Sequence, residues 1–387
     1  SAWQMRTIVL FASLAAPVAL RVVESDRDDG IAKRQAMAYP DKLWEKVHFG
    51  FDANITDNTK LAVRLAAKFW NDNTCLDIVE APAATPRLQI QDVGKTCFSG
   101  GIGHLPGKDV HVVKLPGNCG WFGVAAHEIA HALGFYHTHV RTDRDEYITL
   151  FPNKFLNTPE NITTTENNNN FGIPYDYGSI MHYPSEYLSK NWSEPAIVAK
   201  NKDYQQTMGS NIVSFYDVSL MNELYGCKSR CPFCLSARCK NMGFPHPRNC
   251  SKCICPSGYG GDTCEERPVG CGETLTATHT PQFLNYTMER NYTQGHLFDM
   301  CHWHIKAEVP WKVEVKVISL TPRACTPGCA HNGIEIKYLK QTGLTGARFC
   351  CGEQENTTLT SFYSTMPIIS FSRQGFIGFS IQYRMAM

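Results

Sequence analysis

The segment His127-Glu128-Ile129-Ala130-His131-Ala132-Leu133-Gly134-Phe135-Tyr136-His137 follows the spacing H-E-x-x-H-x-x-G-x-x-H. On a helix, residues four positions apart lie within about 40° of each other, so His127 and His131 can both reach one metal ion. Gly134 can adopt the left-handed conformation that ends a helix, and the turn then lets His137 supply a third nitrogen. Glu128 can accept a proton from water without occupying a coordination position. The pattern predicts one zinc ion with three protein ligands and an open fourth position, as in catalytic sites.

A bare H-E-x-x-H also occurs by chance in helices that bind no metal, whereas the added glycine and third histidine favour the metal interpretation. A second segment, Ser179-Ile180-Met181-His182-Tyr183, lies further along the chain. A lone methionine is usually a core residue. In one class of zinc peptidase motif, however, a methionine in a turn packs beneath the metal. We therefore expect Met181 to support the site.

With the intervening Arg141-x-Asp143-Arg144-Asp145, these segments resemble the astacin family of metzincin zinc endopeptidases. The resemblance implies an α+β, two-lobed metzincin-type protease domain at residues 35–227, with one Zn²⁺ per chain. It implies that Glu128 is the general base for peptide-bond hydrolysis. It also implies that Tyr183 is both an extra zinc ligand and a catalytic residue, which moves toward the transition state and donates a hydrogen bond to the oxyanion.

Cysteines and glycosylation sequons indicate an extracellular protein. The 17 cysteines are too many for a reducing compartment unless they bind metal. Spacing alone leaves three pairings open for the four cysteines of the protease domain. The resemblance implies Cys75 with Cys227 and Cys97 with Cys119. Candidate glycosylation sites are Asn54, Asn161, Asn191, Asn285, Asn291 and Asn356, and Asn249 is a weaker one because a cysteine stands inside its sequon.

Composition allows two or three domains and excludes several functions. The chain has 387 residues, 43% of them hydrophobic, which is enough for a sizeable core. Lys and Arg total 37 against 36 acidic residues, so no net charge favours nucleic acid or an anionic membrane surface. Residues 1–20 contain Met5-Arg6 and a 13-residue apolar run, which predict a signal peptide, with a buried helix as the alternative. No later run reaches membrane-spanning length, so we expect a secreted protein.

Residues 21–34 predict a short prosegment. It ends in Ala32-Lys33-Arg34, where the basic pair is either a processing site or an ordinary solvated cluster. Astacin prosegments place an aspartate on the zinc within an F-x-G-D motif, and this sequence has no such motif; Asp26, Asp28 and Asp29 are candidate substitutes. Astacins also carry glutamate directly after the third histidine, where it receives the mature N-terminus. Thr138 occupies that position here, which departs from the family pattern for holding the mature N-terminus.

Periodicity predicts the elements around the zinc helix. Leu61, Leu65, Ala66 and Phe69 recur at helical spacing, which predicts an amphipathic helix over 61–70. Residues 87–91 and 110–113 are expected to be strands. In the family, the strand just before the zinc helix edges the cleft and pairs with extended substrate. Residues 157–170, rich in Asn and Thr, predict a surface loop.

Residues 228–265 resemble an EGF-like module. The pattern is Cys253-x-Cys255-Pro256-x-Gly258-Tyr259-Gly260-Gly261-x-x-Cys264, and a unit of this size needs disulfides to fold. It holds seven cysteines after Cys227, so one is left over, with Cys231 and Cys234 the candidates. This C-x-x-C lacks the thioredoxin-like context that a redox role requires.

Residues 271–387 resemble a CUB domain, an all-β sandwich, through the pattern C-x-W-x-I-x-A at 301–307. Alternation at 313–317 and again at 334–336 predicts half-buried strands. His302 and His304 could chelate a metal, although surface histidines are the commoner outcome. Calcium is not expected, because residues 333–338 lack the aspartate that calcium-binding CUB domains use. The pairing of its six cysteines, including adjacent Cys350 and Cys351, stays open.

These observations predict a secreted zinc endopeptidase that cleaves extracellular proteins. The module order resembles secreted nematode astacins, so matrix or cuticle proteins are candidate substrates, and the EGF-like and CUB modules are candidate binding sites for substrates or partner proteins. The alternative is a catalytically silent secreted scaffold that acts through those modules. Loss of Glu128 or a histidine would mark that case, and none is lost.

Overall fold

The computed structural model describes residues 36–37, 42–156, 168–187, 189–191, 194–232, 236–290, 297–322 and 325–387. The predicted signal peptide, the predicted prosegment and its aspartates lie outside these residues. No helix in the described part of the chain is long and apolar enough to cross a membrane.

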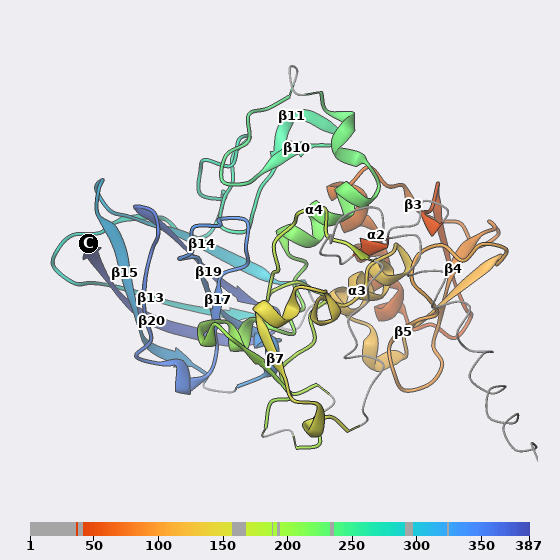
Figure 1. Ribbon diagram of the computed structural model, residues 1–387, viewed down its shortest axis with the longest axis horizontal. Coiled ribbons are helices and arrows are strands. Elements are labelled where there is room, and N and C mark those ends of the chain that lie inside the picture. Colours follow the sequence, from red (N-terminus) through yellow and green to blue (C-terminus); the bar gives the residue numbers. More distant parts are fainter. Residues whose placement is uncertain are drawn as a thin grey trace, which may run out of the picture.

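The first lobe of the predicted protease domain, called here the sheet lobe, is a five-stranded sheet covered by two helices (Figure 1). The strands are β2 (Val47–Phe51), β3 (Ile78–Glu80), β4 (Arg87–Gln91), β5 (Phe98–Ser99) and β6 (Val110–Lys114), in the order β3-β2-β4-β6-β5. The helices are α2 (Asp57–Asn73) and α3 (Phe122–Ala132). Only β5 is antiparallel to its neighbour. Leu88 and Ile90 of β4 are fully buried, as their alternation predicts.

For this lobe, one sequence expectation is confirmed and one needs correction. The predicted amphipathic helix forms as α2: Ala66 is fully buried, and Leu65 and Phe69 are half-buried and pack against the core. Phe69 and Trp70 contact α3, where the Phe69 ring lies 5.7 Å from that of Phe122 and the Trp70 indole donates to the carbonyl oxygen of Ala126. The resemblance placed the strand just before the zinc helix at the edge of the cleft, but that strand, β6, is internal, and the edge strand is the short antiparallel β5.

The second lobe (residues 135–227) has few regular elements. It contains α4 (Phe215–Leu224), β7 (Ile148–Leu150) paired with β9 (Ile197–Ala199), and β8 (Asn168–Asn169) paired with β1 (Ala36–Met37). The predicted surface loop therefore ends in a strand, and Asn170 is buried; residues 157–167 lie outside the described part. A disulfide joins Cys75 of the first lobe to Cys227 at the end of the second, and another joins Cys97 to Cys119, as the resemblance implied.

The cysteine-rich unit (residues 228–265) is a hairpin of β10 (Phe244–His246) and β11 (Asn249–Ile254) with three disulfides. The bridges are Cys231–Cys250, Cys239–Cys253 and Cys255–Cys264. Cys231 is therefore paired, and the other candidate for the leftover thiol, Cys234, lies outside the described residues. Arg248 anchors the unit to the sheet lobe through the carbonyl oxygens of Asn71 and Thr74 and the carboxylate of Asp77.

The C-terminal sandwich (residues 271–387) packs two sheets face to face (Figure 1). One sheet has the order β12-β14-β19-β16-β17 and the other β13-β20-β15-β18. The strands are β12 (Thr274–Thr276), β13 (Gln282–Arg290), β14 (Asp299–Lys306), β15 (Lys312–Thr321), β16 (Asn332–Ile336), β17 (Ala347–Phe349), β18 (Thr358–Thr360), β19 (Thr365–Ser372) and β20 (Gly375–Ala386). Disulfides join Cys271 to Cys301, Cys325 to Cys351 and Cys329 to Cys350.

The predicted alternation holds in β15, where Val313, Val315 and Val317 are fully buried. In β16, by contrast, Glu335 is buried together with its apolar neighbours, because its carboxylate pairs with buried Arg348 at 3.2 Å. The sandwich core is continuous with buried side chains of the second protease lobe, including Tyr177, Ile197 and Tyr204. Sandwich and protease domain thus share one packed interior.

Candidate active site

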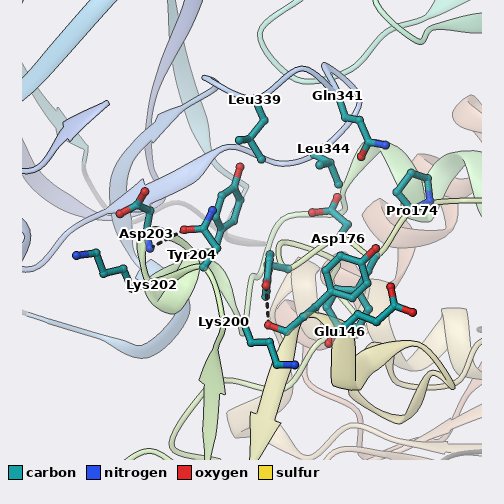
Figure 2. A pocket seen from close by; sticks show the side chains of 14 residues that line it. Glu146, Pro174, Asp176, Lys200, Lys202, Asp203, Tyr204, Leu339, Gln341 and Leu344 are labelled. Atoms are coloured by element: carbon teal, nitrogen blue, oxygen red, sulfur yellow. Dashed lines mark hydrogen bonds between the residues drawn. The ribbon is translucent and has the colours of Figure 1, made fainter. Parts of the chain in front are cut away.

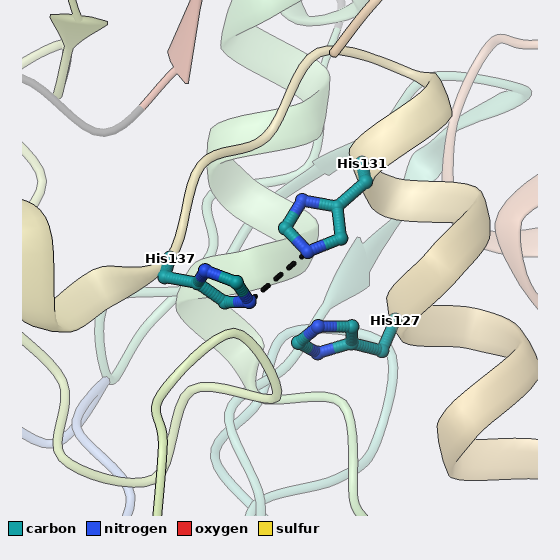
Figure 3. A group of neighbouring side chains, drawn as sticks. All are labelled: His127, His131 and His137. Carbon is teal, nitrogen blue, oxygen red and sulfur yellow. Dashed lines mark hydrogen bonds between the residues drawn. The ribbon is translucent and has the colours of Figure 1, made fainter. Parts of the chain in front are cut away.

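The three motif histidines converge on one point (Figure 3). His127 and His131 project from one face of α3, and His137 follows the turn after it. One ring nitrogen from each lies within 4.8 Å of the others, and the Nε2 atoms of His131 and His137 are 3.1 Å apart. Two nitrogens bound at about 2.1 Å to one tetrahedral zinc ion lie about 3.4 Å apart, so this spacing fits zinc.

Backbone carbonyl groups orient two of these rings for metal binding. The Nδ1 atom of His127 lies 2.7 Å from the carbonyl oxygen of Ile180, and that of His131 lies 2.7 Å from the carbonyl oxygen of Phe135. A carbonyl oxygen only accepts, so each Nδ1 carries the proton and each Nε2 presents a lone pair. Burial, with the neighbouring His127, lowers the pKa of His131 to about 3, which keeps the ring neutral. The residues therefore fit a zinc ion.

Gly134 ends the zinc helix as its position predicts. Its φ is 116°, in the range that favours glycine, and its amide donates to the carbonyl oxygen of His131. The amide of Phe135 donates a hydrogen bond to the carbonyl oxygen of Ala130, which completes a C-terminal cap. This turn brings His137 back toward the ligands on the helix.

Glu128 lies beside the ligands in an enclosed position. It is 6% exposed, and the backbone amide of Ser99 on β5 donates to its carboxylate. Burial raises the pKa of Glu128 to about 7, although the Ser99 amide opposes the shift, as the charge of a bound cation would. A carboxylate with a pKa near neutrality suits a group that accepts and returns a proton.

Met181 is fully buried, and the segment that carries it (residues 176–183, the Met181 segment) is held by hydrogen bonds. The Asp217 carboxylate, in the first turn of α4, accepts from the Ser179 hydroxyl at 2.6 Å and the Ile180 amide at 2.8 Å. It also accepts from the amide of Ser214, the N-cap of α4. Burial raises the pKa of Asp217 to about 6 despite these donors.

Thr138 links the third histidine to the same segment. Its hydroxyl donates to the Ser179 hydroxyl at 2.9 Å, and its amide donates to the Met181 carbonyl oxygen at 2.9 Å. Thr138 is fully buried, so these bonds are shielded from water. The residue that departs from the family pattern therefore begins a hydrogen-bonded chain that runs from Thr138, directly after His137, through Ser179 to Asp217.

The Tyr183 ring packs against the ring of His137, with ring centroids 4.2 Å apart. His139 stacks on it at 4.2 Å, and Tyr187 packs at 4.4 Å. Burial, with Tyr187 and Glu128 close by, raises the pKa of Tyr183 well above its ordinary value, so its hydroxyl stays protonated and can donate. The side chain thus lies among the ligands, where a hydroxyl can reach a reacting group.

The Arg141-x-Asp143 part of the motif is structural. Arg141 and Asp143 form a buried pair with two hydrogen bonds, at 2.9 and 2.8 Å. Arg141 also donates to the carbonyl oxygen of Ile173 and lies over the ring of Tyr175. Tyr175 donates its hydroxyl to His182 at 2.6 Å, next to Tyr183.

Sequence reasoning missed the supporting residues Ser99, Tyr175 and Asp217. Only Asp217 left a signal: it follows Ser214 by three residues at the start of α4, as in a capping box, but that pattern does not show that the carboxylate also binds the Met181 segment.

A second cavity, of about 690 Å³, lies between the second lobe and the sandwich (Figure 2). Tyr147, Tyr175, Tyr177 and Tyr204 form much of its wall, and Leu339 and Leu344 close it from the sandwich. No motif histidine lines this cavity, so it is separate from the metal centre.

The remaining candidate sites differ in outcome. His304 is 2% exposed, and its Nε2 donates to the Gly258 carbonyl oxygen at 2.7 Å, so it joins the sandwich to the cysteine-rich unit and is no metal ligand. His302 belongs to none of the metal-binding clusters found among the described residues. Four of the candidate glycosylation sites are exposed: Asn54, Asn191, Asn285 and Asn356. Asn161 and Asn291 lie outside the described residues.

Comparison with known proteins agrees with this geometry. The family model "Astacin (Peptidase family M12A)" matches residues 36–226. Zinc metalloproteinase nas-31 of Caenorhabditis elegans is 41% identical, over 91% of this chain and 58% of its own length, and nas-32 is 36% identical, over 90% and 53%. The chain thus spans little more than half of these two relatives. Zinc metalloproteinase nas-27 is 32% identical, over 91% of this chain and 87% of its own length. The chain belongs to the astacin family.

Proposed function

We propose that this protein is a zinc-dependent endopeptidase that hydrolyses peptide bonds of extracellular proteins. The observation that carries the proposal is the convergence of three imidazoles, each with a lowered pKa, next to the enclosed carboxylate of Glu128. Zinc at the three histidines would lower the pKa of a coordinated water and polarise the scissile carbonyl.

Glu128 is the general base in this proposal. Its carboxylate takes a proton from the attacking water and returns it to the leaving amine, for which a pKa near neutrality is suited. The Tyr183 hydroxyl, protonated and packed against His137, serves as the extra ligand at rest and donates a hydrogen bond to the developing oxyanion. Met181 supports the histidines from within the core without touching substrate.

We also propose the identity of the two C-terminal regions. The three disulfides and single hairpin of residues 228–265 support an EGF-like module. The two-sheet sandwich, with Cys301, Trp303 and Ile305 buried along β14, supports a CUB domain. Eight disulfides among the described residues support an extracellular location. Matrix or cuticle proteins are the proposed substrate class, and the exposed sequons are proposed glycosylation sites.

The test is cleavage of a peptide library by the secreted full chain, before and after trypsin treatment, together with zinc content. Glu128→Ala removes the base and should abolish cleavage while zinc stays bound. Glu80→Ala, at an exposed carboxylate on β3, is the matched control and should cleave as the unmodified protein does.

Cleavage that needs zinc and disappears only in Glu128→Ala supports the proposal, and the cleavage sites then define the substrate class. A protein that binds zinc but cleaves nothing after any treatment would be the silent binding scaffold instead.

A further inference from the structure

The C-terminal sandwich touches the protease domain at segments that carry the metal centre. The loop between β16 and β17 (residues 337–346) lies against the Met181 segment. The Thr345 hydroxyl donates to the Asp176 carboxylate at 3.0 Å, and the Thr345 amide points to the same oxygen at 3.4 Å. Asp176 is 3% exposed and Thr345 5%, so this contact is closed to solvent.

The fit at this contact leaves no spare room. A Cβ atom placed on Gly178 would come 2.3 Å from the Thr345 methyl carbon, so only glycine fits there. In the same loop, a Cβ atom on Gly343 would come 2.6 Å from the Tyr216 hydroxyl of α4. Asp176 and Leu344 also line the tyrosine-walled cavity of Figure 2, which lies beside this contact.

A short chain of bonds leads from Thr345 to a zinc ligand. The second oxygen of Asp176 accepts from the Gly178 amide at 3.0 Å, which fixes the turn that begins the Met181 segment. Two residues further on, the Ile180 carbonyl oxygen accepts the Nδ1 proton of His127 at 2.7 Å. Partners of this kind orient a metal-binding histidine, and their loss commonly costs 10–100-fold in affinity.

Two more contacts support the same arrangement. Arg348 donates to the Ser210 hydroxyl at 2.7 Å, and neighbouring Gly209 packs on Pro184, directly after Tyr183. On the other side, Arg373 lies 3.8 Å above the ring of Trp121, the N-cap residue of the zinc helix α3. The sandwich therefore contacts α3 and the Met181 segment independently.

We infer that the sandwich is a structural part of the catalytic unit, and that Thr345 is a positioning residue that holds the Met181 segment, and through it His127, in the geometry for zinc. The inference concerns the proposed peptidase site and rests on that proposal for its effect on cleavage. Its effect on zinc affinity can be measured without any cleavage.

The test uses the full chain with Thr345→Val, which removes the hydroxyl but keeps the branched shape. We expect zinc affinity, measured by competition with a chelator, to fall by about 10-fold. For a short peptide that cannot reach the sandwich surface, we expect kcat to fall by about 10-fold while KM changes less than about twofold, since positioning affects the reacting groups more than binding.

Two variants control for simple loss of packing. Thr345→Ser keeps the hydroxyl and should restore both zinc affinity and kcat. Thr342→Val makes the same change in the same loop at a buried threonine whose side chain has no hydrogen bond among the described residues, and it should behave as the unmodified protein. If Thr345→Val does not fold, Arg373→Met tests the contact with α3 by the same two measurements.

The outcomes separate this inference from the proposed function. If folded Thr345→Val binds zinc and cleaves as the unmodified protein does, the inference is wrong. If Thr345→Ser fails as Thr345→Val does, the hydroxyl is not the cause and the inference is also wrong. If the unmodified protein cleaves nothing, the proposed activity fails, while the zinc measurement still decides whether the sandwich positions His127.

Discussion

The zinc helix and the Met181 segment lie on two sides of the same centre, but they are positioned in different ways. In α3, the spacing of His127 and His131 and the cap at Gly134 follow from local helix geometry. The Met181 segment has no regular structure, and its position depends on Asp217 of α4 and on Thr345 of the sandwich. The chemistry of the site is thus encoded over a few residues, whereas its support is assembled from distant parts of the chain.

This difference predicts that variants of the two regions should lose different properties. A change in the zinc helix should remove metal or activity with a modest effect on folding. A change in the support of the Met181 segment should also reduce stability, and in the folded protein it should lower activity less than the loss of a ligand or of the Tyr183 hydroxyl does. The following predictions test that separation, from the largest expected effect to the smallest.

The largest effect is expected for His131→Ala. One of three ligands is lost, so zinc affinity should fall by more than about 100-fold. Peptide cleavage should become undetectable, while thermal unfolding of the zinc-free protein stays close to that of the unmodified zinc-free protein. His139→Ala is the matched control, because His139 is also buried but stacks on Tyr183 and is no motif ligand. Retention of zinc by His131→Ala would contradict the proposed ligand set.

Tyr183→Phe should lower kcat by about 100-fold, because it removes one hydrogen-bond donor to the oxyanion. The ring and its packing against His137 remain, so zinc content and KM should change little. Tyr187→Phe removes the neighbouring hydroxyl and should leave kcat within about twofold. Equal losses in both variants would show that Tyr183 has no special role.

The ligands could be predicted from the sequence because they follow a fixed spacing on one helix and its cap. The same holds for strands such as β15, whose alternation is local. The support of the site could not be predicted, because Asp217 lies 38 residues from Ser179 and Thr345 lies 169 residues from Asp176. Pairing over such separations depends on the fold and leaves no periodic signal.

His304 shows the same limit. Its spacing to His302 allowed metal binding, with a surface position as the commoner outcome, but the ring is buried and its Nε2 donates to the Gly258 carbonyl oxygen of the cysteine-rich unit. The partner in another part of the chain determines the role of this residue.

Asp217→Ala should lower the free energy of unfolding by about 3 kcal/mol, because three buried donors lose their acceptor. Chemical denaturation of the zinc-free protein measures this directly. Asp217→Asn keeps one acceptor oxygen and avoids the cost of burying a charge, so its loss should be smaller. At temperatures where Asp217→Ala is folded, kcat should fall less than in Tyr183→Phe. A larger fall in kcat than in Tyr183→Phe would show that support and chemistry are not separable.

The smallest effect concerns pH and lies in the sheet lobe, at a histidine that contacts Ser99, the residue whose amide donates to Glu128. His111 on β6 is 2% exposed, and its Nε2 lies 2.9 Å from the Ser99 hydroxyl. Burial lowers its pKa to about 4; the nearby His104 adds to this shift, and a hydrogen bond to the Gly103 backbone opposes it.

Because the folded pKa of His111 lies below the unfolded value of about 6.5, the unfolded chain binds the proton first. Its contribution to stability is therefore complete above pH 6.5 and is lost as the pH falls toward 4. Between pH 7 and pH 5.5, this group alone should cost about 1 kcal/mol. His111→Gln should reduce the pH dependence of unfolding by that amount, measured on the zinc-free protein so that metal release does not contribute. Exposed His279→Gln should leave the dependence unchanged, and an unchanged dependence in His111→Gln would mean that His111 titrates alike in the folded and unfolded chain.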